Sequence, residues 1–153
     1  MSGILSLDLG TKTGWCINDP SGPSGGTWDL TPGRYDSRSM RFVRFRQRLN
    51  ELAGAYCVER VVFEEVRRHL GTQAAHVYGG FFAVLSEWCD GRELPYVGVP
   101  VSKIKKYATG KGNAPKSAMI AACRERLGVD PADDNEADAR WLLALEIGRG
   151  GAK

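Results

Sequence analysis

The fold of this chain is decided first by the stretch Ile4-Leu5-Ser6-Leu7-Asp8-Leu9-Gly10. Its apolar residues predict a buried β-strand over residues 4–9, which Asp8 interrupts near the carboxyl end. A buried carboxylate without a partner is costly, so Asp8 needs a cation or a strong hydrogen-bond donor. Ligand sites of open α/β sheets gather at the carboxyl ends of strands. The stretch therefore predicts either a functional aspartate or a turn aspartate that caps the loop over 10–13.

Further strands and helices follow along the chain. Strands are predicted at 15–18, 27–30, 60–66 and 96–99, the first two forming a hairpin across a glycine-rich loop over 19–26. Helices are predicted at 37–56 (capped by Asp36 or Ser37), 72–89, 117–127 and 135–147. This order predicts a single α/β domain over 1–148, with a mixed five-stranded sheet flanked by helices, and a frayed tail over 149–153.

The composition is that of a globular protein. Of 153 residues, 42% are hydrophobic and 25% are charged, which argues against disorder, and no repeat suggests a solenoid. No apolar run is long enough for a membrane span and the N-terminus does not resemble a signal peptide, so we expect a cytoplasmic protein. Four cysteines without a CxxC pair are expected to be reduced and buried.

Charge is distributed unevenly along the chain. Residues 34–48 hold six arginines and one acid, which we interpret as a solvated helix face. Residues 94–124 hold five lysines and no acid, and 103–116 is predicted to be a glycine-rich basic loop that suits a phosphate backbone. The loop lacks the GKS/T ending of a P-loop, so no nucleotide cofactor is expected. The expected partner is therefore a polyanion rather than a membrane.

Two further groups of acids can accompany Asp8. The strand over 60–66 ends in Glu64 and Glu65, and strand alternation places only one of them on the face of the site. Asp134 and Asp138 lie four residues apart at the start of a helix and project from one face. The ordinary alternatives are a strand end in solvent and acids that favour a helix dipole. Together the acids could hold two Mg²⁺ ions and support phosphodiester hydrolysis.

Four motifs in order resemble the RuvC-type Holliday-junction resolvases of the RNase H-like superfamily, in their short phage and bacterial versions. They are Leu7-Asp8-x-Gly10 with Thr13-Gly14, Phe63-Glu64-Glu65-Val66, Lys105 with Thr109-Gly110-x-Gly112-x-Ala114-x-Lys116, and Glu136-Ala137-Asp138-Ala139. The resemblance extends over about residues 3–147. It implies an RNase H-like fold and a metal-dependent endonuclease that resolves branched DNA in recombination or repair.

The resemblance also implies roles for individual residues. Asp8, Glu64 and Asp138 match three metal ligands, but Asn135 stands where the family usually has a fourth aspartate, and Asp134 is the nearest substitute. Lys105 and Lys116 match basic residues near the scissile phosphate. Further DNA contacts are expected from Lys103, Lys106, Lys111, Arg67 and Arg68.

The family implies Mg²⁺ or Mn²⁺ dependence, cleavage that leaves 5′-phosphate and 3′-hydroxyl ends, and a homodimer. The helix over 72–89 is the candidate dimer face, through Val77, Gly79, Gly80, Ala83 and Val84.

Other interpretations differ in the class of protein. The opening Leu7-Asp8-Leu9-Gly10-Thr11-Lys12 also resembles YqgF-type nucleases of the same fold, although the acidic strand and the lysine segment fit RuvC better. Actin-like sugar kinases share an Asp-x-Gly-Thr turn but need two such domains. A branched-DNA binding protein that has lost cleavage is suggested by Asn135, and metal-dependent nicking separates it from a nuclease.

Overall fold

The computed structural model describes residues 3–69 and 71–151 and is built on one five-stranded sheet. The strand order is β3-β2-β1-β4-β5, in which β2 is antiparallel to both its neighbours and β1, β4 and β5 are parallel. The strands are β1 (Ile4–Asp8), β2 (Lys12–Ile17), β3 (Ser24–Asp29), β4 (Arg60–Glu65) and β5 (Tyr96–Pro100). The predicted mixed five-stranded sheet and the hairpin of its second and third strands are confirmed.

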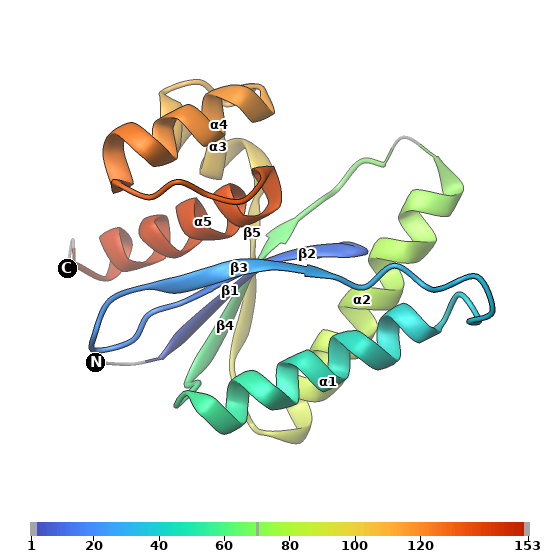
Figure 1. Cartoon of the computed structure of the whole chain (residues 1–153). Coiled ribbons are helices and arrows are strands. Elements are labelled where there is room, and N and C mark those ends of the chain that lie inside the picture. The colour runs from blue at the N-terminus through green and yellow to red at the C-terminus, as the bar shows by residue number, and fades with distance from the viewer. Residues whose placement is uncertain (1–2, 70, 152–153) are drawn as a thin grey trace.

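Helices cover both faces of this sheet, as Figure 1 shows. One face carries α1 (Met40–Ala55) and α2 (Thr72–Gly91). The other carries α3 (Val101–Thr109), α4 (Lys116–Ala122), a π-helical turn (Cys123–Leu127) and α5 (Asp134–Gly151). No helix in the described residues is both long and apolar enough to cross a membrane.

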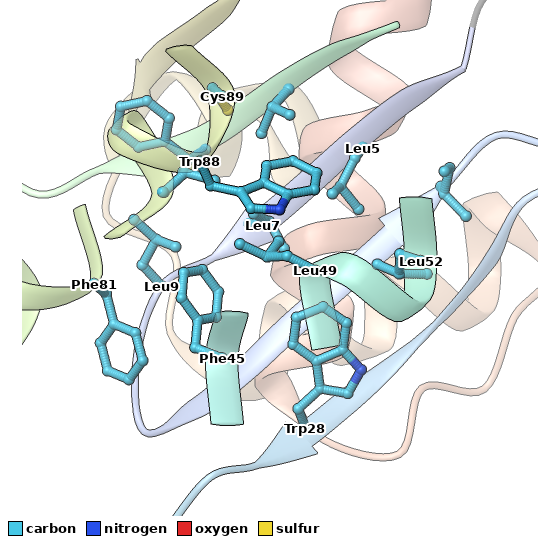
Figure 2. Packing of buried hydrophobic residues seen from close by; sticks show 14 of the residues in the cluster. Leu5, Leu7, Leu9, Trp28, Phe45, Leu49, Leu52, Phe81, Trp88 and Cys89 are labelled. Carbon is cyan, nitrogen blue, oxygen red and sulfur yellow. The ribbon is translucent and has the colours of Figure 1, made fainter. Parts of the chain in front are cut away.

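The core beneath α1 and α2 contains the side chains from one face of the central strands β1 and β4. Leu5 and Leu7 of β1 point into this core, where Phe45 of α1 and Phe81 of α2 pack edge to face with ring centroids 5.1 Å apart (Figure 2). The indole of Trp88 lies in the same core and donates a 2.9 Å hydrogen bond to Asn50. Residues 5 and 7 therefore anchor β1 to this layer, and residues 4, 6 and 8 face the other way.

The core on the other face is built around α5. Trp141 and Leu142 pack with Ile4 of β1 and Val62 of β4. The buried hydroxyl of Ser6 donates a 2.7 Å hydrogen bond to the carbonyl of Ala139, which fixes α5 along β1. The side chains of β1 and β4 on this face consequently point at α5 all the way to their carboxyl ends.

Several predicted boundaries are wrong for local reasons. β2 begins at Lys12 and β3 at Ser24, because backbone pairing of the hairpin extends into the predicted turn and loop. α1 begins at Met40 because Asp36 accepts a hydrogen bond from Gly33 and pairs with Arg44 instead of capping the helix.

The chain after β5 also departs from the prediction. Residues 101–109 form α3, so the predicted basic loop is confined to the turn between α3 and α4. α5 continues to Gly151, so residues 149–151 of the predicted tail are helical, and 152–153 lie outside the described residues.

One cysteine differs from expectation. Cys16, Cys89 and Cys123 are buried and unbridged as predicted, but Cys57 is exposed. It lies in the link between α1 and β4, where its carbonyl, rather than its side chain, packs against Gly3.

Candidate active site

Asp8 and Glu64 end two adjacent parallel strands. Leu7 of β1 is the register partner of Phe63 of β4, so the next residue along each strand is an acid. Both acids lie on the face that carries α5, because Leu7 and Phe63 point into the opposite core. Glu65 falls on the other face of β4 and forms a 3.1 Å ion pair with Arg67. The prediction that only one of the two glutamates lies on the face of the site is therefore confirmed in their placement.

Asp138 joins them from the first turns of α5. Ligand oxygens of Asp8, Glu64 and Asp138 all lie within 4.8 Å of one another, and the three residues are partly buried. α5 reaches this position because its start lies directly on β2: a Cβ atom at Gly14 would overlap the carbonyl of Asn135. Three residues distant in sequence therefore form one acidic cluster at the carboxyl ends of β1 and β4.

The cluster is electrostatically unfavourable by itself. Burial and the neighbouring Glu64 carboxylate raise the pKa of Asp8 well above its ordinary value, with smaller contributions from Asp138 and Asp134. Burial, Glu64 and Asp134 likewise raise the pKa of Asp138 to about 7, although Lys105 and Lys116 oppose the rise. Like charges held this close disfavour ionisation, and a bound cation removes that cost.

The donor set fits a hard divalent cation. Three carboxylates offer only oxygen ligands, which Mg²⁺, Mn²⁺ and Ca²⁺ prefer, and no cysteine or histidine takes part in the cluster. Clustered acids are also common without an ion on protein surfaces, but these three lie partly buried and at the ends of core strands. The structure thus contains a candidate metal centre with Asp8, Glu64 and Asp138 as ligands.

The acids around Asn135 have separate surroundings. Asp134 raises the pKa of both Asp8 and Asp138 and lies 3.5 Å from the ammonium of Lys116, which places it at the margin of the cluster. Asn135 instead hydrogen-bonds to Asp133. Glu136 is buried in a 2.6 Å ion pair with Arg140, away from the cluster.

The five lysines of the basic segment do not share one environment. Lys105 on α3 and Lys116 at the start of α4 are close enough to Asp138 to lower its pKa. Lys103 and Lys106 line a shallow groove with Tyr107 and Leu145, and Lys111 is exposed in the turn after α3. α3 forms because Ile104 and Ala108 bury one side of it, and Gly110 ends it with a φ of 86°.

Other predicted contacts lie further along the edge. Arg67 and Arg68 are exposed in the segment that follows β4, and the guanidinium of Arg67 forms an ion pair with Glu65. Sequence reasoning missed Tyr78 of α2, whose hydroxyl donates a 3.0 Å hydrogen bond to the carbonyl of Glu64 and accepts one from Val66. These two hydrogen bonds hold the end of β4 in place. No sequence pattern indicates them, because Tyr78 and β4 come together only in the folded protein.

The chain is similar in sequence to a curated protein. It is 37% identical over 95 residues to the crossover junction endodeoxyribonuclease RuvC of Nocardia farcinica, a stretch of 61% of this chain and 47% of that protein. The match thus spans about half the length of the relative. No protein-family model matches the chain.

Solved structures match over nearly the whole chain. RuvC of Thermus thermophilus in complex with a Holliday junction substrate has a TM-score of 0.76 at 19% identity, covering 92% of this chain and 90% of that one. The yeast mitochondrial Holliday junction resolvase Ydc2 has a TM-score of 0.61 at 13% identity, covering 92% and 75%. The predicted resemblance is confirmed in the fold, which is the RNase H-like fold of the RuvC resolvases.

Proposed function

We propose that this protein is a divalent-metal-dependent endonuclease that resolves Holliday junctions or related branched DNA. The observation that carries the proposal is the meeting of Asp8, Glu64 and Asp138 at one edge of a RuvC-like sheet. The reaction is hydrolysis of a phosphodiester bond that leaves a 5′-phosphate and a 3′-hydroxyl. We place it in the cytoplasm of a bacterial or phage-infected cell, where its DNA substrate lies.

Mg²⁺ is the proposed cofactor, with Mn²⁺ as a substitute and two ions per site. Asp8, Glu64 and Asp138 would hold the ions, and Asp134 would serve as the fourth carboxylate in place of the aspartate that Asn135 replaces. Bound divalent ions lower the pKa of water and offset charge on the leaving oxygen. The three carboxylates lie at the carboxyl ends of β1 and β4 and in the first turns of α5, so they would hold a cation at this end of the sheet.

The lysines divide between catalysis and binding in this proposal. The Lys116 side chain is 83% exposed beside Asp134, so its ammonium can reach a phosphate held at the acidic cluster. Lys105 is half-buried near Asp138 and supplies a second fixed positive charge. Lys103, Lys106, Lys111, Arg67 and Arg68 are exposed and are proposed to contact more distant phosphates.

A homodimer is the proposed assembly, because a four-way junction has two opposed strands to cut. Of the α2 residues expected at the interface, Gly79 and Ala83 are exposed, and the exposed Phe82, which was not expected there, is proposed beside them. Val77 and Val84 instead pack against the core of the same chain, and the ring of Phe42 fills the space beside Gly80. Light scattering at micromolar concentration, with and without junction DNA, should give the mass of two chains. A monomeric mass in both conditions would contradict the dimer.

The function is tested with labelled four-way junction, linear duplex and flap substrates, each in Mg²⁺, Ca²⁺ or EDTA. We expect paired nicks in the junction with Mg²⁺ and binding without cleavage in EDTA. Tight junction binding with no cleavage in Mg²⁺ or Mn²⁺ would favour the binding protein without nuclease activity. Equal cleavage of all three substrates would contradict selectivity for branched DNA.

A further inference from the structure

The six arginines of residues 34–48 fall into two groups in the structure. In the first group, every arginine has an acidic partner: Arg44 lies 2.6 Å from Asp36, Arg46 lies 3.3 Å from Glu87, and Arg48 lies 3.3 Å from Glu51. These pairs fit the solvated helix face expected from the sequence. Their charges are neutralised within the chain.

The second group, Arg34, Arg38 and Arg41, has no acidic partner among residues 3–69 and 71–151. The one acid in the segment, Asp36, is held by Arg44, which contributes to lowering its pKa. Arg34 and Arg38 are exposed, and Arg41 is partly buried. We call these three residues the arginine cluster; its three positive charges form no ion pair within the part of the chain that the structure describes.

The arginine cluster is fixed to the same edge of the sheet as the acidic cluster. The guanidinium of Arg41 donates a 2.9 Å hydrogen bond to the hydroxyl of Thr11, and the amide of Leu30 donates a 2.8 Å bond to the carbonyl of Thr11. Thr11 lies three residues after Asp8 in the turn that follows β1. The segment that carries the arginines is therefore positioned relative to Asp8.

Arg41 of the arginine cluster and the lysines Lys105 and Lys116 belong to helices on opposite faces of the sheet. α1 covers one face, and α3 and α4, which carry Lys105 and Lys116, lie over the other (Figure 1). The acids lie on the face that carries α3, α4 and α5, so Arg41 reaches the same end of the sheet from the opposite face. One straight duplex held against α3 and α4 passes on the far side of the sheet from α1, whereas arms that diverge from a branch can reach both surfaces.

The side chain of Arg34, at one end of the arginine cluster, is held in place by its neighbours before any ligand binds. The Arg34 guanidinium carbon lies 5.6 Å from the ring centroid of Tyr35, an aromatic residue that is 92% exposed. A tight turn supports them, because the amide of Gly33 donates a 2.7 Å bond to Asp36 and the amide of Asp36 donates to the Gly33 carbonyl. An arginine held over a ring loses less side-chain freedom when it binds an anion.

From this arrangement we propose that the arginine cluster is a second DNA-binding surface, which holds the phosphates of a further arm of the branched substrate. The inference rests on the proposed function, since it names another part of the same substrate. Arginines suit this role because a guanidinium can bind phosphate oxygens with two parallel hydrogen bonds.

The test compares two double variants with the same change of charge. Arg34→Ala with Arg38→Ala removes two unpaired arginines from the loop before α1, and Arg46→Ala with Arg48→Ala removes two paired ones from α1 itself. Binding to an immobile four-way junction and to a linear duplex is titrated in Ca²⁺ at several salt concentrations. The first variant should bind the junction about tenfold more weakly. The salt slope, which is the slope of the logarithm of the binding constant against the logarithm of the salt concentration, should fall in magnitude by about 2, because each lost phosphate contact lowers it by about 0.9.

The control variant should keep both the affinity and the salt slope of the unaltered protein. Equal losses from the two double variants would overturn the proposal, because general charge would then explain the effect. Equal losses for junction and duplex would overturn the assignment to a further arm.

Cleavage of the same junction in Mg²⁺ by the unaltered protein separates this inference from the proposed function. Binding without cleavage contradicts only the nuclease. Normal cleavage with undiminished binding by the Arg34 and Arg38 variant contradicts only the second surface.

Discussion

The carbonyl group of Asn135 lies against the backbone of Gly14, at a separation that leaves no room for a Cβ atom. This contact joins the start of α5 to the middle of the β-hairpin. From it, α5 runs along β1, where Ser6 binds the carbonyl of Ala139 one residue beyond Asp138. The position of Asp138 beside Asp8 therefore depends on a glycine that takes no part in the chemistry.

Gly14→Ala should lower the free energy of unfolding by about 1–3 kcal/mol, the usual range for overpacking a tight site. It should also weaken divalent-metal binding, because α5 must move away from β2 and carry Asp138 with it. Chemical denaturation and a metal-induced shift in melting temperature measure the two effects. Gly54→Ala, in α1 with open space around its Cβ position, is the control and should not destabilise the protein. Equal stability of the two variants would contradict the close contact.

The metal-free protein should lose stability through Asp8 and Asp138 as the pH rises. The pKa of Asp8 is raised by burial and by Glu64, and that of Asp138 is raised to about 7, whereas an unfolded aspartate has a pKa of about 3.9. The folded state thus binds protons more tightly, so the stabilisation is complete below about pH 4 and is lost as the pH rises, between about pH 4 and 7 for Asp138.

Asp8→Asn removes one of the two carboxyl groups that take up these protons. The variant therefore serves as the reference for the pH dependence of the unaltered protein. The measured quantity is the melting temperature of the unaltered protein minus that of Asp8→Asn, both in EDTA. This difference should be lower at pH 8 than at pH 5. Mg²⁺ at pH 8 should stabilise the unaltered protein more than the variant. A relative melting temperature that rises between pH 5 and pH 8 would have the wrong sign for this site.

Asp134 and Asn135 can be separated by substitution. Asp134 lies at the margin of the acidic cluster and Asn135 hydrogen-bonds to Asp133 instead. Asp134→Asn should therefore reduce cleavage in Mg²⁺ about tenfold or more, as is typical when a group that supports a metal site is lost. Asn135→Ala should have a small effect, because the contact to Gly14 uses its backbone. Small effects from both variants would show that three carboxylates are sufficient.

Lys116→Ala should reduce the single-turnover cleavage rate at saturating protein by about a hundredfold or more, by analogy with the loss of one oxyanion donor. Lys106→Ala is the matched control, since Lys106 is exposed beside Tyr107 and Leu145 rather than beside the acids. It should weaken binding modestly and cut at a near-normal rate once bound. If Lys116→Ala lost only affinity, Lys116 would be an ordinary phosphate contact.

Local sequence patterns singled out Asp8 and Glu64 as candidates, whereas Asp138 lies where acids are common at a helix start, and its role as a ligand followed from the resemblance to RuvC-type resolvases. Asp8 and Glu64 interrupt apolar strands, and alternation alone separates Glu64 from Glu65. The helical segment over 101–109 was missed because its lysines and the glycines that follow it resemble a loop, while the apolar positions that decide its structure are only Ile104 and Ala108. The contacts of Asp36 with Arg44 and of Gly14 with Asn135 depend on the fold, so no local pattern predicts them.

Two adjacent glutamates on opposite faces of β4 provide the most direct test of the metal centre. Glu64→Gln and Glu65→Gln remove the same charge from neighbouring positions, and single-turnover cleavage of a four-way junction is measured for each in Mg²⁺ at saturating protein. We expect Glu64→Gln to abolish cleavage while junction binding in Ca²⁺ persists, and Glu65→Gln to cut at nearly the normal rate. Mg²⁺-dependent cleavage retained by Glu64→Gln, or lost equally by both variants, would contradict a metal centre formed by Asp8, Glu64 and Asp138.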